Sequence, residues 1–232
     1  MPIGKIFNLS YKGKKYVLYN LKTYLEEIGV QYSIGDQSIS RLNHIGFHTL
    51  DELENFYTHN LEHPLKSTAL HTVFSNHKKH AKIMLIGEAP GQEEDEKGEP
   101  FVGKSGQLLT ELLRSVNLTR DDAYITNLVP WRPPGNRNPT PEEMAFFLPY
   151  LHKHIQLVNP KCILLLGGIV TRALFGEHVR ISSFRGKFHP LTIEDKSYEV
   201  LPTFHPSYLL RSPRQKKLAW IDMKLLRQYI RS

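Results

Sequence analysis

The sequence has few of the residues on which several common classes of protein depend. Its 232 residues include a single cysteine, Cys162, which excludes an internal disulfide framework and an all-cysteine metal site. The GxxxxGK[ST] pattern is absent, so the chain has no phosphate-binding loop of that type. No apolar run approaches the ~20 residues of a membrane-spanning helix, and the first residues show no signal-peptide pattern. These absences predict a cytoplasmic protein with no membrane partner.

The composition is otherwise that of a globular protein with an excess of positive charge. Hydrophobic residues make up 40% of the chain and charged residues 23%, which is typical of a soluble domain with one sizeable core. The formal net charge is +7, which makes a polyanionic partner plausible.

The first 55 residues differ from the remainder. Residues 1–20 alternate apolar and polar side chains around Gly13, which favours either a short hairpin or an ill-ordered arm. Residues 21–30 predict a helix that ends at a glycine, and residues 49–60 predict another. The basic cluster HKKH follows at 77–80. We divide the chain into an N-terminal extension, 1–55, packed on or flanking the core, and a main domain, 56–232.

From residue 81, short apolar runs alternate with helical patterns. The runs AKIMLIG, DAYITN, KCILLL and YEVLPT predict four buried strands, with amphipathic helices between and after them. This alternation predicts the α/β class, as a three-layer α/β/α sandwich around a four-stranded parallel sheet. Ligands bind beyond the carboxyl ends of such strands, which selects four loops at 87–91, 127–138, 167–168 and 205–211.

Two of these loops begin with side chains suited to recognising a base. Asn127 ends the second strand; asparagine there is often only a turn former, but its amide also presents a donor and an acceptor together. Of the twelve histidines, His205 follows the fourth strand, and Pro206 restrains its backbone to an extended conformation. The loop at 87–91 is rich in glycine and is followed by carboxylates, which would repel phosphate.

Three segments together resemble a known family. GEAPGQEEDEKGEPFVGKSGQLL, ITNLVPWRPPGNRNPTPEE and LPTFHPSYLLRSP are similar, in this order, to motifs of the family-four uracil-DNA glycosylases. The similarity covers about residues 60–230. It implies the α/β/α fold of that superfamily and a monomeric enzyme that removes uracil from DNA by cleaving the N-glycosidic bond, after flipping the nucleotide out of the duplex.

The resemblance also implies roles for individual residues. Phe101 would stack on the flipped uracil, Asn127 would read its O4 and N3 edge, and His205 would donate to O2 as negative charge develops there. Backbone at Gly87, Ala89 and Gly91 would complete the base pocket. The implied DNA contacts are a wedge at Leu209 or Leu210 and phosphate contacts at Ser105, Ser207 and Arg211.

The chain departs from related enzymes at the first loop. In family-one enzymes this turn reads GQDPY, and its aspartate helps to position the attacking water. Ala89 occupies the place of that aspartate, and Gly91 occupies the place of a tyrosine that excludes thymine. The carboxylate role then falls to Glu88, with Glu94 as the second choice, or is not needed.

A second departure concerns the cofactor. Typical family-four members hold an iron–sulfur cluster with four cysteines, and here the corresponding positions are Asn60, His63, Trp131 and Phe147. We therefore expect no metal and no cofactor. The chain also lacks the basic insertion through which a neighbouring branch bonds covalently to DNA.

Three other hypotheses remain open from the sequence. The same pocket would suit another deaminated base such as hypoxanthine. The scaffold would also suit a DNA-binding protein without catalysis, or an unrelated nucleotide-binding α/β enzyme.

Overall fold

The centre of the molecule is a five-stranded sheet with the order β4-β3-β5-β7-β6. The structure, a computed structural model, describes residues 6–11, 14–19, 47–77 and 81–231. The strands are β3 (Ile83–Gly87), β4 (Ala123–Asn127), β5 (Cys162–Leu166), β6 (His189–Ile193) and β7 (Lys196–Thr203). Strands β3, β4, β5 and β7 are parallel, as the alternation of strand and helix patterns predicts.

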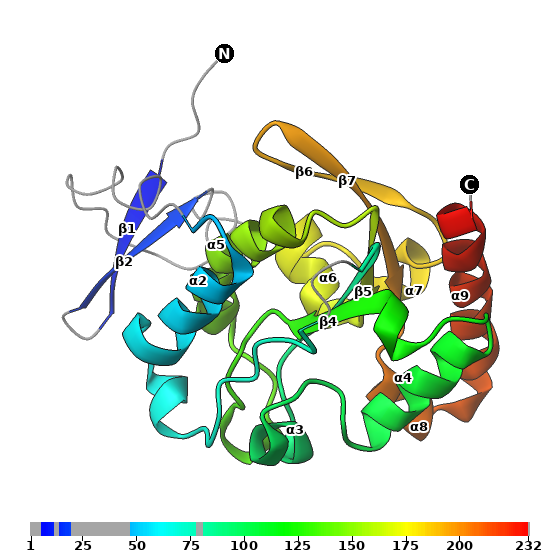
Figure 1. The fold of residues 1–232 in the computed structure, drawn as a ribbon, viewed down its shortest axis with the longest axis horizontal. Helices are drawn as coiled ribbons and strands as arrows, with labels where there is room; N and C mark the ends of the chain where they lie inside the picture. Colours follow the sequence, from blue (N-terminus) through cyan, green and yellow to red (C-terminus); the bar gives the residue numbers. More distant parts are fainter. Residues whose placement is uncertain (1–5, 12–13, 20–46, 78–80, 232) are drawn as a thin grey trace.

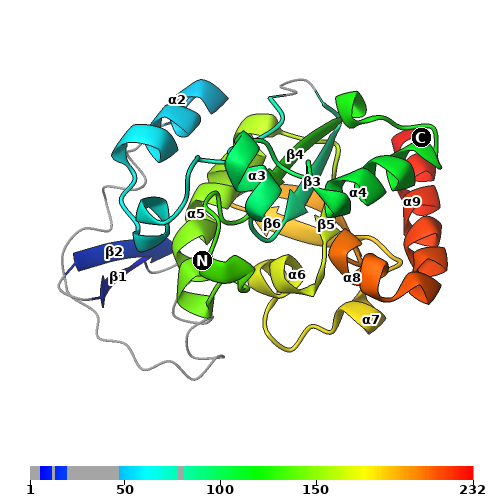
Figure 2. The same ribbon diagram turned by 90° about the horizontal axis from the view of Figure 1, so that it is seen from below.

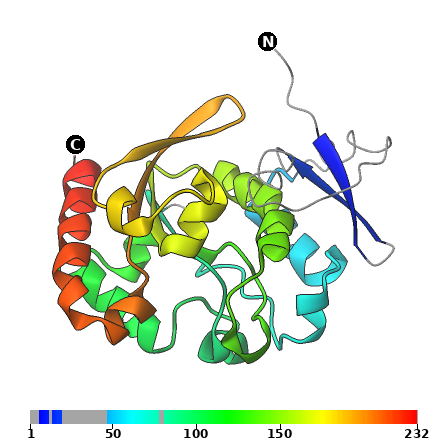
Figure 3. The ribbon, with the colours of Figure 1, turned by 180° about the vertical axis from the view of Figure 1, so that it is seen from behind.

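The fifth strand was not predicted. β6 pairs antiparallel with β7 at one edge of the sheet, and this hairpin projects beyond the other strands (Figures 1 and 3). Glu194 turns the chain there with a φ of 52°. Pro190 lies within β6, a residue that sheets accommodate on an edge strand because it lacks a backbone donor. The predicted fold class is confirmed, with one strand more than expected.

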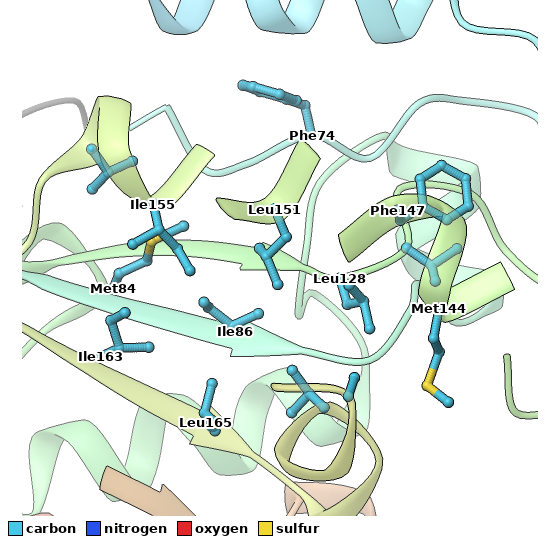
Figure 4. Close-up of a cluster of buried hydrophobic side chains, with 14 of the residues drawn as sticks. Phe74, Met84, Ile86, Leu128, Met144, Phe147, Leu151, Ile155, Ile163 and Leu165 are labelled. Atoms are coloured by element: carbon cyan, nitrogen blue, oxygen red, sulfur yellow. The ribbon is translucent and has the colours of Figure 1, made fainter. Parts of the chain in front are cut away.

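Helices cover both faces of the sheet (Figure 2). On one face lie α4 (Lys104–Arg114) and α9 (Lys216–Arg231). They pack against the side chains of β3 that point to this face, such as Leu85. On the other lie α5 (Pro141–Val158) and α6 (Gly168–Phe175). Figure 4 shows Met84 and Ile86 of β3 and Ile163 and Leu165 of β5 turned toward Leu151 and Ile155 of α5. Every residue of β3, β4 and β5 is buried, as the continuous apolar runs predict.

The remaining elements are short. They are the hairpin β1 (Ile6–Tyr11) and β2 (Lys14–Tyr19), the helices α2 (Leu50–Asn55), α3 (Gln92–Lys97), α7 (Ile181–Phe184) and α8 (Pro206–Arg211), and the single turns η1 (Phe56–Asn60), η2 (Pro64–Ser67), η3 (Arg120–Asp122), η4 (Pro134–Asn136) and η5 (Pro213–Gln215). The hairpin alternative for residues 1–20 is confirmed for the described strands. The predicted helix at 21–30 and residues 78–80 of the basic cluster lie outside the described residues.

The end of the N-terminal extension contacts the main core. Phe47 and Leu53 are buried in the same cluster as the side chains that cover β3 and β5. Thr49 caps α2 by accepting from the backbone N–H of Glu52, as the capping-box spacing predicts. None of the helices in the described part of the chain combines the length and the apolar character that crossing a bilayer requires.

Candidate active site

A pocket of about 910 Å³ opens at the carboxyl ends of the parallel strands. This is the edge at which ligands bind in parallel sheets. Ten of the predicted site residues line it: Glu88, Ala89, Gly91, Glu94, Phe101, Ser105, Asn127, His205, Ser207 and Arg211. Three predicted residues, Gly87, Leu209 and Leu210, do not line it.

Asn127 supplies the most informative polar group in the pocket. The residue ends β4 and is 6% exposed. Its side-chain oxygen, Oδ1, is buried and accepts no hydrogen bond within the described residues. A buried polar atom without a partner is costly in a folded protein, by about 1–3 kcal/mol. A ligand that brings a donor to Oδ1 would remove this cost.

Gly87 makes room for Asn127 and Phe101 although it does not face the pocket. A Cβ at this position would lie 2.4 Å from Asn127 Oδ1 and 2.6 Å from Phe101 Cζ. Any larger residue would therefore displace both side chains. The prediction of Gly87 as a site residue stays a prediction, and the close approach supplies its physical reason.

Phe101 is held in an unusual conformation. Its φ is 55°, a left-handed value that is uncommon for residues other than glycine. Gly106 allows this conformation, because a Cβ there would lie 1.7 Å from the Phe101 carbonyl oxygen. Arg120 donates to the same carbonyl at 3.0 Å and to that of Pro100 at 2.8 Å. The Phe101 ring lies 5.8 Å from the His205 ring, centroid to centroid.

The Glu94 carboxylate is occupied by backbone donors. Its Oε1 accepts from the N–H groups of Val102 and Gly103 at 3.0 and 2.9 Å, and its Oε2 accepts from that of Gly91 at 3.2 Å. These bonds join the start of α3 to the loop that carries Phe101. Glu94 thus has a clear role in holding the pocket wall.

Glu88 is the carboxylate that remains for a reacting water. Burial raises its pKa, while the positive charges of Arg211 and Arg172 act in the opposite direction. No hydrogen bond to its side chain is present among the described residues. The structure therefore keeps Glu88 as the first choice for the carboxylate role, which stays a prediction.

His205 is a neutral hydrogen-bond donor in this geometry. Burial, followed by the charge of Arg211, lowers its pKa to about 4. The backbone N–H of Ser207 donates to Nδ1 at 3.1 Å, and the Ser207 hydroxyl lies 2.8 Å from the same nitrogen. Because Nδ1 accepts, the proton of the neutral ring is on Nε2. The ring therefore offers Nε2–H to the pocket.

The two leucines predicted as alternatives for the DNA wedge differ in exposure. Leu209 is fully buried, in a small cluster with Phe204 and Ala219, so it has no surface with which to enter a duplex. Leu210 is 41% exposed. The wedge prediction therefore rests on Leu210, followed along α8 by the exposed Arg211.

Sequence reasoning missed several residues of the pocket wall. Arg172 lies on α6, one turn after the predicted loop at 167–168, and Ile181 and Ser182 belong to α7. Arg137 and Tyr208 line the pocket from loops that were predicted. Arg172 could have been found from its place one helical turn beyond the glycines. The short α7 carries no comparable signal.

The comparisons with known proteins agree with this geometry. Residues 74–224 match the model of the family described as the uracil DNA glycosylase superfamily. The chain belongs to the uracil-DNA glycosylase superfamily. It is 40% identical over 153 residues to a Type-4 uracil-DNA glycosylase of Sulfurisphaera tokodaii, covering 64% of this chain and 70% of that one.

Two further relatives extend the match within the superfamily. A Type-4 uracil-DNA glycosylase of Thermotoga maritima is 40% identical over 171 residues, 72% of this chain and 88% of that one. The Type-4 uracil-DNA glycosylase of Archaeoglobus fulgidus is 40% identical over 148 residues, 62% of this chain and 74% of that one. The resemblance stated from the three motifs is confirmed.

The iron–sulfur cluster typical of family four within this superfamily does not fit the residues present. Three of the four corresponding positions lie together but carry rings: His63 to Phe147 is 4.9 Å between centroids and Trp131 to Phe147 is 5.5 Å. Asn60 is exposed, and Cys162 is buried in β5. In the described ranges, no group of three or more histidine, cysteine, aspartate or glutamate side chains could hold a metal ion.

Proposed function

We propose that this protein is a uracil-DNA glycosylase, a hydrolase that excises uracil from DNA in base excision repair. One observation carries the proposal beyond the family match: the buried Oδ1 of Asn127 has no donor among the residues that the structure describes. Uracil offers N3–H to such an oxygen and O4 to the neighbouring amide NH₂. Cytosine presents the opposite polarity at both positions, so it would leave Oδ1 facing a lone pair.

The pocket residues divide the reaction between them. The flipped uracil stacks on the ring of Phe101 and pairs with Asn127. As the bond between C1′ and N1 breaks, its electron pair leaves with the base, and His205 Nε2–H donates to O2, where the negative charge develops. Water then bonds to C1′ and gives one proton to Glu88, the uracil anion takes up a proton as it leaves, and an abasic sugar remains.

The positive charge around the pocket suits a DNA backbone. Arg137, Arg172 and Arg211 all line the opening; Arg137 also pairs with Glu143, and Arg172 with Glu177. Ser105 lies in the first turn of α4, where free backbone N–H groups favour an anion. These residues would hold the phosphates beside the flipped nucleotide while Leu210 fills the space that the base leaves.

The test is incubation of the protein with an oligonucleotide that contains one uracil, followed by alkali, which cuts at abasic sites. Strand cleavage that depends on uracil supports the proposal. A parallel panel with hypoxanthine, thymine and cytosine at the same position tests the base. Absence of cleavage with all four bases, combined with tight DNA binding, would favour the non-catalytic alternative.

Two finer predictions belong to the same proposal. We propose that the enzyme acts as a monomer, because one pocket contains the base-reading, stacking and donor residues on a single chain. Sedimentation at working concentration measures this. We also propose that it acts in the cytoplasm, which fractionation of the source cells with an antibody would test.

A further inference from the structure

A buried ion pair lies behind the pocket, outside the residues discussed so far. Arg185 Nε donates to Asp222 Oδ2 at 2.8 Å, and Arg185 Nη2 donates to Asp222 Oδ1. The Asp222 side chain is 0% exposed and that of Arg185 is 10% exposed. Thr203 Oγ1 completes the group by donating to Asp222 Oδ2 at 2.6 Å. Every one of these atoms is thus hydrogen-bonded.

Each member of the group is attached to a different wall of the pocket. Thr203 is the last residue of β7 and is followed by Phe204 and His205, which line the pocket. Arg185 follows α7, whose Ile181 and Ser182 line it.

The Arg185 guanidinium makes two further contacts with pocket residues. Its Nη2 donates at 2.7 Å to the carbonyl of Leu218, a residue that lines the pocket. Its carbon Cζ lies 5.4 Å from the centre of the Phe204 ring. The ion pair therefore joins β7, α7 and the start of α9 beside Thr203 and Phe204, the two residues that precede His205.

We propose that Arg185 and Asp222 are positioning residues for base excision: they fix the segment Thr203–Phe204–His205 so that the His205 ring meets the departing base. The proposal rests on the proposed function. A buried ion pair contributes little net stability compared with apolar side chains of the same volume. What the pair would contribute to the reaction is therefore the fixed position of the segment that carries His205.

The need for such support follows from the local structure. His205 is the N-cap of α8, a helix of six residues. Within the described ranges, Ser207 of the same turn is the only residue that bonds to its Nδ1. The backbone of Thr203 is fixed by the bond from Gly167 N–H to its carbonyl. Asp222 fixes the Thr203 side chain, and Arg185 covers the ring of Phe204.

Two substitutions test the pair without leaving a buried charge alone. R185K keeps the positive charge beside Asp222 but loses the planar two-nitrogen contact. Thr203→Val removes one hydroxyl and keeps the side-chain shape. The matched control is Tyr124→Phe, which removes another buried hydroxyl of the sheet. This hydroxyl lies 2.7 Å from His154 Nε2 and belongs to β4, a strand that does not carry His205.

The measurements are the single-turnover excision rate at saturating enzyme and the affinity for DNA with an uncleavable 2′-fluoro-deoxyuridine. We expect R185K and Thr203→Val to lower the rate by roughly 10- to 100-fold, as small misplacements of a catalytic group do. Their DNA affinity should stay within about twofold, as should the rate of Tyr124→Phe, because binding contacts are retained.

A third measurement does not require activity. The ¹⁵N chemical shifts of the His205 ring report which nitrogen carries the proton, and we expect both variants to change them while Tyr124→Phe does not. Rates and ring shifts equal to those of the wild type in folded R185K and Thr203→Val would overturn the positioning role. So would losses no larger than those of Tyr124→Phe. An inactive wild-type protein would instead remove the proposed function, and the ring shifts would still decide the role of the pair.

Discussion

The pocket and a neighbouring aromatic cluster use similar residues in opposite ways. The aromatic cluster consists of His63, Trp131, Phe146 and Phe147. Two of its ring nitrogens have partners inside the protein: Trp131 Nε1 donates to Thr72 Oγ1 at 3.0 Å, and His63 Nδ1 accepts from the N–H of Leu65 at 3.1 Å. In the pocket, Asn127 Oδ1 has none among the described residues. Histidine and aromatic rings therefore indicate a site only where a polar atom is left for a ligand.

Among the substitutions considered, the largest effect should be a loss of folding stability on truncation of the aromatic cluster. Trp131→Ala removes a side chain that is 1% exposed, so we expect a loss of about 3–5 kcal/mol in the free energy of unfolding. Denaturant titration measures it. The second tryptophan, Trp220, is 43% exposed, and Trp220→Ala is the matched control, with a loss below about 1 kcal/mol. Equal losses would show that the aromatic cluster stabilises the fold no more than an exposed ring does.

In the pocket, the corresponding large effect should be on rate. His205→Ala removes the Nε2–H donor, and we expect the single-turnover rate to fall by roughly 100- to 1,000-fold, as when one oxyanion donor is deleted. Binding of uncleavable DNA should change little. His48→Ala, on an exposed residue, serves as the control. A His205→Ala enzyme with nearly wild-type single-turnover rate would remove His205 from the mechanism.

Asn127→Asp tests the partnerless oxygen itself. A carboxylate can accept from uracil N3–H but cannot donate to O4, so we expect the uracil excision rate to fall by roughly tenfold or more, at about 1.4 kcal/mol per factor of ten. The ratio of uracil to cytosine excision should also fall. Asn117→Asp changes an exposed asparagine and is the control. Unchanged rate and selectivity would make Asn127 a structural turn residue.

The buried histidines predict that stability falls in acid. Burial lowers the pKa of His154 to about 3 and that of His205 to about 4, from the ordinary 6.5. Between those values and 6.5 the unfolded chain binds more protons, so stability is lost as pH falls through this window, by at most about 1.4 kcal/mol per pH unit for each group. Denaturant titrations from pH 7 to 4 measure the slope. His154→Gln should make it shallower, and an identical slope would contradict the assignment.

The smallest expected signal is the iron content. A four-iron cluster needs four thiolates, and the chain contains one cysteine. We expect purified protein to contain no stoichiometric iron by elemental analysis. A stoichiometric amount, with an absorption band near 400 nm, would overturn both this prediction and the interpretation of the aromatic cluster.

The residues that follow the strands could be predicted because strand ends are local signals. Asn127 is the last residue of its strand, and His205 comes two residues after the end of its strand. Parallel strands bring such positions to one edge of the sheet. The edge strand β6 was missed because HPLTI contains no continuous apolar run and Pro190 argues against a strand.

Contacts between distant segments had no such signal. Arg185 and Asp222 are 37 residues apart, and neither belongs to a recognisable motif. Glu94 was a candidate for catalysis because its acidity is visible in the sequence. That its oxygens accept from backbone N–H groups eight and nine residues away depends on how the loop closes, which composition does not show.

The left-handed backbone of Phe101 has a consequence for engineering the protein. At its φ of 55°, the backbone alone favours glycine, by roughly 1–2 kcal/mol relative to a residue with a Cβ. In the proposed function, the ring at the same position stacks on the base. A screen for thermal tolerance would respond both to the backbone conformation and to the packing of the ring, whereas a screen for repair would respond to the ring alone. Phe101 is 6% exposed, so loss of its ring would cost about 3–5 kcal/mol, more than the backbone would gain. Selection for heat and selection for activity should therefore keep the same residue at position 101.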